Sequence, residues 1–272
     1  MRIAGVLFPY CEKEKILKVV ILAGGLGTRI SEETHLRPKP MITIGGMPIL
    51  WHIMKSYADQ GFDDFVVCGG YKCQVIKEFF SNYLLHTSDV TFNLGNGETK
   101  FLKSSDESWN VTVVDTGYYT QTGGRLKRVS EFLSSDEPFF FTYGDGLANV
   151  NFREQLCFHR SHNGIATVLG VIPPARYGAL EVKNGVVESF EEKPATKFSG
   201  RINGGFFILD KKVIDYIDGD SCSFETDQLQ ILARQEKLHS FQHDGFWHAM
   251  DTFRDLELLR KLWASGNIPW KR

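Results

Sequence analysis

A short apolar strand that runs directly into a glycine-rich turn constrains the fold of this chain more than any other feature. Residues 19–29 read Val-Val-Ile-Leu-Ala-Gly-Gly-Leu-Gly-Thr-Arg. A continuous apolar run of this kind is typical of a strand that is buried on both faces of a parallel sheet. Glycines directly after such a strand let a ligand approach the backbone closely and leave N–H groups pointing outward. The segment therefore predicts an α/β fold with an anion-binding loop at the carboxyl edge of its sheet.

The residues around this turn indicate which anion it binds. A P-loop needs a Lys-Ser/Thr pair after its last glycine, and none follows Gly27. The dinucleotide fingerprint needs Gly or Ala three places after its second glycine, where this chain has Ile30, which argues against a nicotinamide oxidoreductase. Arg29 adds a cation with a fork suited to phosphate oxygens, and Lys39 adds a second cation between two prolines. We expect a phosphate ligand; a tight turn without a ligand is the alternative.

Composition and charge exclude several classes of protein. The 272 residues are long enough for one large or two small domains, and 31 basic against 33 acidic residues give a net charge of −2. No basic field is therefore available to attract nucleic acid or an anionic membrane, and no apolar run approaches the ~20 residues that span a bilayer. The five cysteines are scattered and odd in number, which is typical of free thiols in a reducing compartment: Cys11, Cys68, Cys73, Cys157 and Cys222. We expect a cytoplasmic protein with small-molecule partners, and neither nucleic acid nor a membrane among its partners.

Strands alternate with helices along the first half of the chain, which predicts a mostly parallel sheet covered on both faces. The apolar pattern predicts strands at 19–22, 65–68, 139–143, 165–172 and 204–209. It predicts helices at 48–60, 75–84, 125–133, 211–217 and 224–235, and a last helix that starts at Thr252 and ends before Gly266. Residues 89–115 are rich in β-formers with a turn at Gly95–Gly97, and Asn184-Gly185 predicts another hairpin. We predict an N-terminal extension of unknown role over residues 1–18 and a single α/β domain over 19–272, with a β-rich excursion in its middle.

Two aspartates are candidate metal ligands. Asp145 directly follows the apolar strand 139–143 and lies between two glycines, which places its carboxylate at the ligand-binding edge of the sheet. Asp251 precedes Thr252, the expected N-cap of the last helix. Either residue alone is more often a cap or a turn former. Together with a phosphate loop they become plausible ligands of Mg²⁺, which binds one or two carboxylates and substrate phosphates.

The segment 22–29, followed by Lys39-Pro40-Met41, resembles the pyrophosphorylase motif of sugar-1-phosphate nucleotidyltransferases. Segments 115–117, 122–128, 143–146 and 246–252 look closest to the glucose-1-phosphate cytidylyltransferases of that family. The resemblance runs from about Val19 to the C-terminus. It implies a Rossmann-like three-layer fold with a mixed, mostly parallel central sheet and a β-rich insertion. It also implies Mg²⁺-dependent transfer of CMP from CTP to α-D-glucose 1-phosphate, which gives CDP-glucose and pyrophosphate, in a homo-oligomer that supplies surface polysaccharide synthesis such as that of O-antigen.

The resemblance assigns roles residue by residue. It implies that Arg29, Lys39 and Asp145 are catalytic and that Asp145 and Asp251 hold the metal. The nucleotide would be bound by Leu22, Ala23, Gly24, Gly25, Leu26, Gly27, Thr28, Arg29, Lys39, Thr120, Thr122, Gly124, Arg125 and Gly144. The sugar phosphate would be bound by Tyr177, Gly178, Glu192, Lys193, Asn203 and Gly204.

One departure from the wider family bears on the base. Uridylyl- and thymidylyltransferases carry a Gln in a Gln-Pro-x-Gly-Leu-Ala stretch, and this chain has Thr-Gln-Thr-Gly-Gly-Arg at 120–125. Arginine has only hydrogen-bond donors, so Arg125 suits the O2/N3 acceptor edge of cytosine. Alternatively, Arg125 only begins a helix or forms a salt bridge. Two other hypotheses remain. One is the same transfer from UTP or dTTP, and the other is a non-catalytic regulatory subunit that binds a nucleotide sugar. All four charged residues at 29, 39, 145 and 251 are present, which argues against the regulatory subunit.

Overall fold

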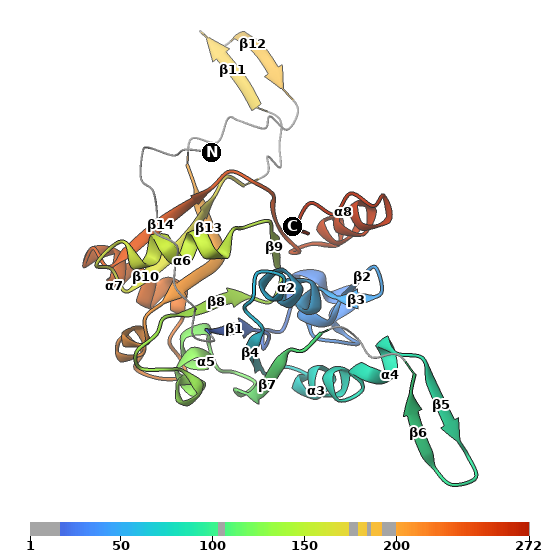
Figure 1. Ribbon diagram of the computed structural model, residues 1–272. Helices are drawn as coiled ribbons and strands as arrows, with labels where there is room; N and C mark the ends of the chain where they lie inside the picture. The colour runs from blue at the N-terminus through green and yellow to red at the C-terminus, as the bar shows by residue number, and fades with distance from the viewer. Residues whose placement is uncertain (1–16, 103–106, 174–178, 184–185, 192–199, 272) are drawn as a thin grey trace.

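The chain folds into three layers, with helices on both sides of a central sheet (Figure 1). The computed structural model describes residues 17–102, 107–173, 179–183, 186–191 and 200–271; for 179–183 and 186–191 it describes the backbone alone. No helix within these ranges is both long and apolar enough to cross a membrane. Of the predicted N-terminal extension, residues 1–16 lie outside the described residues, and the first strand begins at Lys18.

The central sheet has seven strands in the order β14-β10-β13-β8-β1-β4-β7. Their bounds are β1 (Lys18–Leu22), β4 (Asp64–Gly69), β7 (Asn110–Asp115), β8 (Phe139–Tyr143), β10 (Ala166–Val171), β13 (Ile202–Leu209) and β14 (Leu238–His243). β1 pairs in parallel with both β4 and β8, and β4 pairs in parallel with β7. β13 is antiparallel to β8 and to β10, while β10 and β14 are parallel. Six strands therefore run one way and β13 runs the other, which is the mixed, mostly parallel sheet that we predicted.

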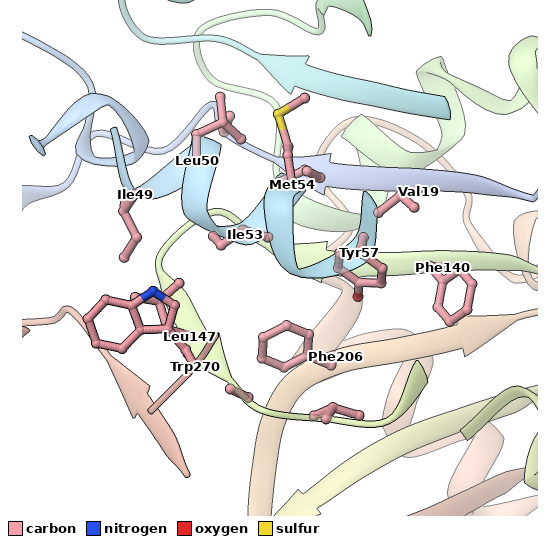
Figure 2. Close-up of a cluster of buried hydrophobic side chains, with 14 of the residues drawn as sticks. Val19, Ile49, Leu50, Ile53, Met54, Tyr57, Phe140, Leu147, Phe206 and Trp270 are labelled. Carbon is pink, nitrogen blue, oxygen red and sulfur yellow. The ribbon is translucent and has the colours of Figure 1, made fainter. Parts of the chain in front are cut away.

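The strands alternate their side chains between two apolar cores. Val19 and Ile21 face the core beneath α2 (Ile49–Ala58), α3 (Cys73–Ser81), α6 (Phe152–Arg160) and α8 (Phe253–Ala264). Val20 and Leu22 face the core beneath α5 (Thr122–Arg128) and α7 (Leu229–Arg234). Figure 2 shows side chains of α2, among them Ile53 and Tyr57, directed toward the sheet. Both faces of each central strand are thus buried, which explains why the strand sequences are apolar throughout.

Most predicted elements are confirmed, with corrections at their ends. The predicted helix at 125–133 begins earlier, at Thr122, ends at Arg128 and is followed by a 3-10 turn. The stretch at 211–217 is a 3-10 helix, and 224–235 divides into a π-helix (Phe224–Gln228) and α7. The elements that were not predicted include strands β14 and β15 (Trp247–Ala249), the short strands at 43–44, 47–48 and 146–148, and helix α6.

Four small two-stranded sheets complete the fold. β9 (Gly146–Ala148) pairs with β15, and β2 (Thr43–Ile44) pairs with β3 (Met47–Pro48). β11 (Ala179–Lys183) and β12 (Val186–Glu191) form the hairpin predicted around residues 184 and 185. β5 (Val90–Asn93) and β6 (Glu98–Phe101) follow α4 (Tyr83–Thr87) and form a hairpin that projects away from the body (Figure 1).

Candidate active site

A cavity of about 610 Å³ opens at the carboxyl end of the central strands. It is lined by the turn after β1, by residues 142–146 at the end of β8 and by residues 202–206 of β13. Because β13 runs against its neighbours, its amino end reaches this same edge. Open α/β sheets bind their ligands at the carboxyl edge. The cavity therefore lies where the glycine-rich turn predicted a ligand.

The inner half of the glycine-rich turn forms part of the cavity wall. The Ala23 N–H donates to the Cys68 carbonyl at 2.9 Å, so β4 holds the start of the turn. A Cβ at Gly24 would lie 2.1 Å from the Arg125 guanidinium, and no side chain fits there. Gly27 has a φ of +64°, which favours glycine. The turn is therefore built from glycine for two separate reasons: close packing at its start and backbone conformation at its end.

Lys39 lies between the two predicted metal ligands. Its Nζ is 2.6 Å from Asp145 Oδ2 and 3.0 Å from Asp251 Oδ1, and all three side chains are partly buried. Burial alone would lower the pKa of Lys39, but the charges and hydrogen bonds of the two carboxylates outweigh it and raise the pKa above its ordinary value. A Cβ at Gly144 would lie 2.5 Å from the Leu22 carbonyl, so this glycine lets the end of β8 approach β1 closely. Three segments far apart in the sequence thus meet at one cluster of charge.

The two carboxylates suit a metal ion whose coordination a bound substrate would complete. Within the described residues, no group of three or more His, Cys, Asp or Glu side chains could hold an ion alone. Mg²⁺ is bound in many enzymes by one or two carboxylates together with phosphate oxygens and water. Asp145 and Asp251 already share one cation, the Lys39 ammonium, so the spacing of their oxygens accepts positive charge between them. The donor set therefore suits Mg²⁺ carried in by a phosphate-bearing ligand rather than a preformed metal cage.

Arg125 lies in the middle of α5, where it is almost completely buried and lines the cavity. Its Nη1 donates to Gly69 O, Thr116 Oγ1 and Gly117 O, and its Nη2 donates to Gly24 O and Tyr118 O, at 2.8–3.4 Å. Burial lowers the pKa of Arg125, yet arginine stays charged at any ordinary pH. A permanent positive charge therefore lies directly beneath the glycine-rich turn. α5 begins at Thr122 and not at Arg125, and within the described residues the Arg125 guanidinium hydrogen-bonds to backbone and hydroxyl oxygens rather than to a carboxylate.

A polar wall on the side of α5 and β13 contains residues that sequence reasoning missed. Thr122 Oγ1 donates to Glu225 Oε2 at 2.6 Å, and Asn203 Nδ2 donates to the Tyr143 hydroxyl at 3.3 Å. Burial, with the negative charge of Glu225 nearby, raises the pKa of Tyr143 well above its ordinary value. Tyr143 and Glu225 therefore join the predicted residues Thr122 and Asn203 on one surface of the cavity.

Trp247 is a further residue of the cavity wall. Its Nε1 donates to the Gly204 carbonyl at 2.7 Å, which fixes the indole against β13. The aromatic pair at 246–247, close to Asp251, was a sequence signal for Trp247. The position of Tyr143, two residues before Asp145, was a signal for Tyr143. No sequence signal marked Glu225.

The structure brings most of the predicted residues together. The predicted residues that line the cavity are Leu22, Ala23, Gly24, Gly25, Lys39, Thr120, Thr122, Arg125, Gly144, Asp145, Asn203, Gly204 and Asp251. The ones that do not line it are Leu26, Gly27, Thr28 and Gly124. The side chain of Arg29 and residues Tyr177, Gly178, Glu192 and Lys193 lie outside the described part of the structure.

Comparisons with known proteins agree with this geometry. The family model described as nucleotidyl transferase matches residues 18–261. The chain is 52% identical to a glucose-1-phosphate cytidylyltransferase of Salmonella typhimurium, over 94% of this chain and 99% of that protein. It is 42% identical to a probable glucose-1-phosphate cytidylyltransferase of Bacillus subtilis, again over 94% and 99%. A solved structure of a UDP-glucose pyrophosphorylase complexed with UDP-glucose superposes with a TM-score of 0.66 at 16% identity, covering 93% of this chain and 100% of that one, which shows a shared fold.

Proposed function

The chain belongs to the nucleotidyl transferase family, and from this premise we infer that it is a glucose-1-phosphate cytidylyltransferase. It transfers CMP from CTP to α-D-glucose 1-phosphate and releases pyrophosphate. The 52% identity over nearly the full length of a cytidylyltransferase supports this reaction. In the geometry, one observation carries it: a glycine-rich turn and a Lys39–Asp145–Asp251 cluster share one cavity wall.

The reaction needs alignment and charge neutralisation more than proton transfer. An oxygen of the sugar phosphate attacks the α-phosphorus of CTP, the bond from that phosphorus to the bridging oxygen breaks, and its electron pair leaves with pyrophosphate. The attacking oxygen is already an anion, so no general base is required. Both reactants are polyanions, so positive charge and N–H donors at fixed positions supply most of the catalysis.

Lys39 is proposed to change its partners when CTP enters. It is held to Asp145 and Asp251 at hydrogen-bond distance, and the same ammonium can turn to the α-phosphoryl group. The two carboxylates would then hold Mg²⁺ together with the phosphates, and the metal would neutralise charge on the α-phosphate and on the leaving group. The family is typically Mg²⁺-dependent, which agrees with this donor set. We assign Arg29 to the departing pyrophosphate, as the resemblance implies.

Cytosine recognition is assigned to the wall around Arg125. Its Nη1 shares two hydrogens among three acceptors, so these bonds are bifurcated and one can be exchanged for a base atom. Arginine can only donate, which suits the O2 and N3 acceptors of cytosine and not the N3–H of uracil. Thr120 and Gln121 also line this part of the cavity and offer oxygens to the N4 amino group.

The sugar phosphate is assigned to the wall formed by β13 and its neighbours. Asn203 and Gly204 line the cavity there, and Tyr143 and Glu225 add a hydroxyl and a carboxylate that suit sugar hydroxyls. We assign Glu192 to the sugar hydroxyls as well and Lys193 to the 1-phosphate, as the resemblance implies. The role of Gly178 and Tyr177 beside the sugar is proposed on the same basis.

We further propose that the protein is a homo-oligomer that works in the cytoplasm. Cys68 is buried, and burial raises the pKa of its thiol to about 12, which is consistent with an inert free cysteine in a reducing compartment. The single-domain boundary at 19–272 is proposed as well, since the family match covers residues 18–261 as one unit.

Pyrophosphate release with glucose 1-phosphate tests the function. CTP, UTP, dTTP, ATP and GTP are compared side by side, with Mg²⁺ and after chelation. We expect a strong preference for CTP that disappears when the metal is removed. Equal or better use of UTP or dTTP would keep the enzyme class and overturn the base assignment, and activity that survives chelation would overturn the metal.

A further inference from the structure

Glu225 places a negative charge on the wall of a cavity that, under the proposed function, receives two polyanions. A carboxylate at such a place opposes the binding of phosphates, because like charges repel at a partly buried site. Within the described part of the chain, the hydrogen bonds to its carboxylate come from hydroxyl groups and not from a lysine or an arginine. A role that outweighs this repulsion must therefore lie in what those hydroxyls do.

Glu225 is hydrogen-bonded to the side of the cavity that we assign to the base, residues 120–125, which we call the base wall. Thr122 Oγ1 donates to Glu225 Oε2 at 2.6 Å, and Thr122 is the first residue of α5. The same hydroxyl oxygen accepts from the Phe224 N–H at 2.8 Å. The neighbouring segment therefore uses the donor of Thr122 and one of its acceptor sites, which fixes the orientation of this side chain.

The backbone that precedes Glu225 supports the same wall. The Asp220 carbonyl accepts from the Gln121 N–H at 2.8 Å, and the Cys222 carbonyl accepts from the Gly123 N–H at 3.0 Å. A Cβ at Gly123 would lie 2.9 Å from that Cys222 oxygen, so the two segments are in close contact. The start of α5 therefore cannot shift without moving residues 220–225.

Glu225 also faces the side of the cavity that we assign to the sugar, Tyr143 with residues 202–206, which we call the sugar wall. Burial first, and then the charge of Glu225 and a hydrogen bond with it, raise the pKa of Tyr143 well above its ordinary value. The Tyr143 hydroxyl accepts from Asn203 Nδ2 at 3.3 Å, and Asn203 Oδ1 accepts from the Gly205 N–H at 2.8 Å. A chain of polar contacts thus runs from α5 through Glu225 and Tyr143 to β13.

The carboxylate lies on a firmly anchored part of the chain. It belongs to the π-helix Phe224–Gln228, a rare form that is frequent at functional sites. Phe224 is completely buried, and the centre of its ring lies 5.0 Å from that of Phe141 on β8 and 5.6 Å from that of Phe207 on β13. Ser223 Oγ donates to Glu225 Oε2 at 3.1 Å. The position of Glu225 is therefore fixed relative to both strands.

We propose that Glu225 is a positioning residue that holds the base wall and the sugar wall at one separation, so that CTP and glucose 1-phosphate are bound in matching positions. This inference rests on the proposed function and adds a residue that serves both substrates. Within the described residues, the hydrogen bonds of Glu225 do not reach the cluster of Lys39, Asp145 and Asp251. Loss of Glu225 should therefore weaken substrate binding more than it slows the chemical step.

Steady-state kinetics of the full-length protein with Glu225→Gln test the proposal. The amide keeps the size of the side chain, removes its charge and replaces one acceptor oxygen with a donor. We expect KM for CTP and KM for glucose 1-phosphate each to rise at least ~10-fold, the scale for losing hydrogen bonds to a charged group, with a smaller change in kcat. Repulsion alone predicts the opposite sign, because removing a negative charge would lower both KM values. Glu131→Gln, in the exposed 3-10 turn after α5, is the matched control and should keep wild-type values.

A double-mutant cycle tests the link between the two walls. Thr122→Val keeps the shape of the side chain and removes the hydroxyl that donates to Glu225. We expect it to raise KM for glucose 1-phosphate as well as for CTP, although Thr122 lies on the base wall. Thr122→Ser restores the hydroxyl and should recover most of the loss. The combined variant Thr122→Val/Glu225→Gln should be little worse than Glu225→Gln, because both substitutions break the same contact.

Three results would overturn the proposal. They are KM values that are unchanged or lower in Glu225→Gln; a rise for one substrate alone, which would make Glu225 a contact of that substrate only; and independent effects of the two substitutions. Circular dichroism checks that the variants are folded, and if Glu225→Gln does not fold, Thr122→Val carries the test.

Isothermal titration calorimetry with CTP and with glucose 1-phosphate, each added alone, repeats the comparison without turnover. Wild type should bind each ligand at least ~10-fold more tightly than Glu225→Gln. A wild type that binds both ligands but releases no pyrophosphate would contradict the proposed reaction and not this inference. An active wild type whose variants bind both ligands equally well would contradict this inference and not the reaction.

Discussion

At the scale of single residues, Lys39 shows how the site stays folded before a ligand arrives. The Lys39 ammonium lies within about 3 Å of both carboxylates, and its positive charge offsets the electrostatic repulsion between them. Removing one carboxylate therefore alters two things at once: the metal donor set and the position of Lys39. A single change at this cluster should affect turnover far more than stability.

We expect Asp145→Asn to lower the rate of CTP-dependent pyrophosphate release at least ~100-fold, the usual scale for losing one electrostatic partner of a transition state. The amide keeps the shape of the side chain and loses the charge that binds the metal. Asp136→Asn, in an exposed loop, is the control and should keep wild-type turnover. Near-normal turnover of Asp145→Asn would exclude the metal role.

Arg125→Lys should weaken the preference for CTP over UTP roughly tenfold or more, since lysine keeps the charge but loses the planar fork. The same substitution removes links to the backbone at Gly24 and Gly69, so stability should fall as well. The ratio of kcat/KM for CTP and UTP is the decisive measurement. Arg128→Lys, at an exposed ion pair with Asp220, is the control. A less stable protein with an unchanged nucleotide preference would limit Arg125 to a framework role.

Sequence reasoning could predict site residues where a motif or a resemblance marked them. Lys39, Asp145 and Asp251 were predicted, and the structure places them together. Glu225 could not be predicted, because its place beside Thr122 depends on how the π-helix after residue 223 packs on α5. Such proximity is a product of tertiary packing and leaves no local signal in the chain.

At the scale of elements, the ends of β8 and α8 position the two carboxylates. Asp251 precedes a capping box in which Thr252 Oγ1 accepts from the Asp255 N–H, and the Asp255 carboxylate accepts from the Thr252 N–H. The same carboxylate accepts from the Asp251 N–H at 3.1 Å. The helix cap therefore also fixes the backbone of a candidate metal ligand.

Thr252→Ala should lower the free energy of unfolding by about 1 kcal/mol, the usual cost of removing an N-cap hydroxyl. Urea unfolding curves of wild type and variant measure this difference in the free energy of unfolding. Thr99→Ala on the exposed β6 strand is a control that removes the same hydroxyl without a cap. An unchanged free energy of unfolding would mean that α8 does not depend on this cap.

Apolar runs and caps made most elements predictable, and the absence of an apolar run explains why β14 was missed. The segment Leu-His-Ser-Phe-Gln-His at 238–243 lacks β-branched residues, so no pattern marked β14. It becomes a strand because it pairs in parallel with β10 at the edge of the sheet. Likewise, α5 ends at Arg128 and not at residue 133, because the segment that follows it forms a 3-10 turn over Ser130–Phe132.

At the scale of the whole molecule, a chain of hydrogen bonds through His162 and His159 joins α6, β10 and the residue after β13. The Gly164 N–H donates to His162 Nδ1 at 3.1 Å, so the other ring nitrogen of His162 donates to Thr167 Oγ1. The Thr167 hydroxyl can then donate to His159 Nδ1, whose other nitrogen lies 3.3 Å from Asp210 Oδ1. In this order the His162 ring is uncharged.

Acid should therefore destabilise the protein through this chain. Burial first, and then the neighbouring rings of His239 and His159, lower the pKa of His162 from 6.5 to about 4, against the opposing charge of Asp210. The unfolded chain binds a proton at pH values where the folded one does not, so stability is lost as the pH falls from about 6.5 toward 4. Urea midpoints between pH 7 and 4.5 measure the slope.

The matched variant for this pH dependence is His162→Gln, which keeps a polar side chain and cannot titrate. We expect a shallower loss of stability with acid than in wild type, and His86→Gln, on α4 away from this chain of rings, should leave the slope unchanged. An identical slope in His162→Gln and wild type would contradict the assignment.

The distance along the chain between Lys39 and Asp251 has a consequence for how the enzyme is made. The two residues are 212 positions apart, and Trp247 and Asp251 belong to the last part of the cavity wall to leave the ribosome. A nascent chain can already have formed the strands around the glycine-rich turn while its second carboxylate is still unsynthesised. Such a chain lacks the complete set of charged groups that the reaction requires. The reaction therefore requires that the chain has been made at least as far as Asp251 and that this residue has joined Lys39.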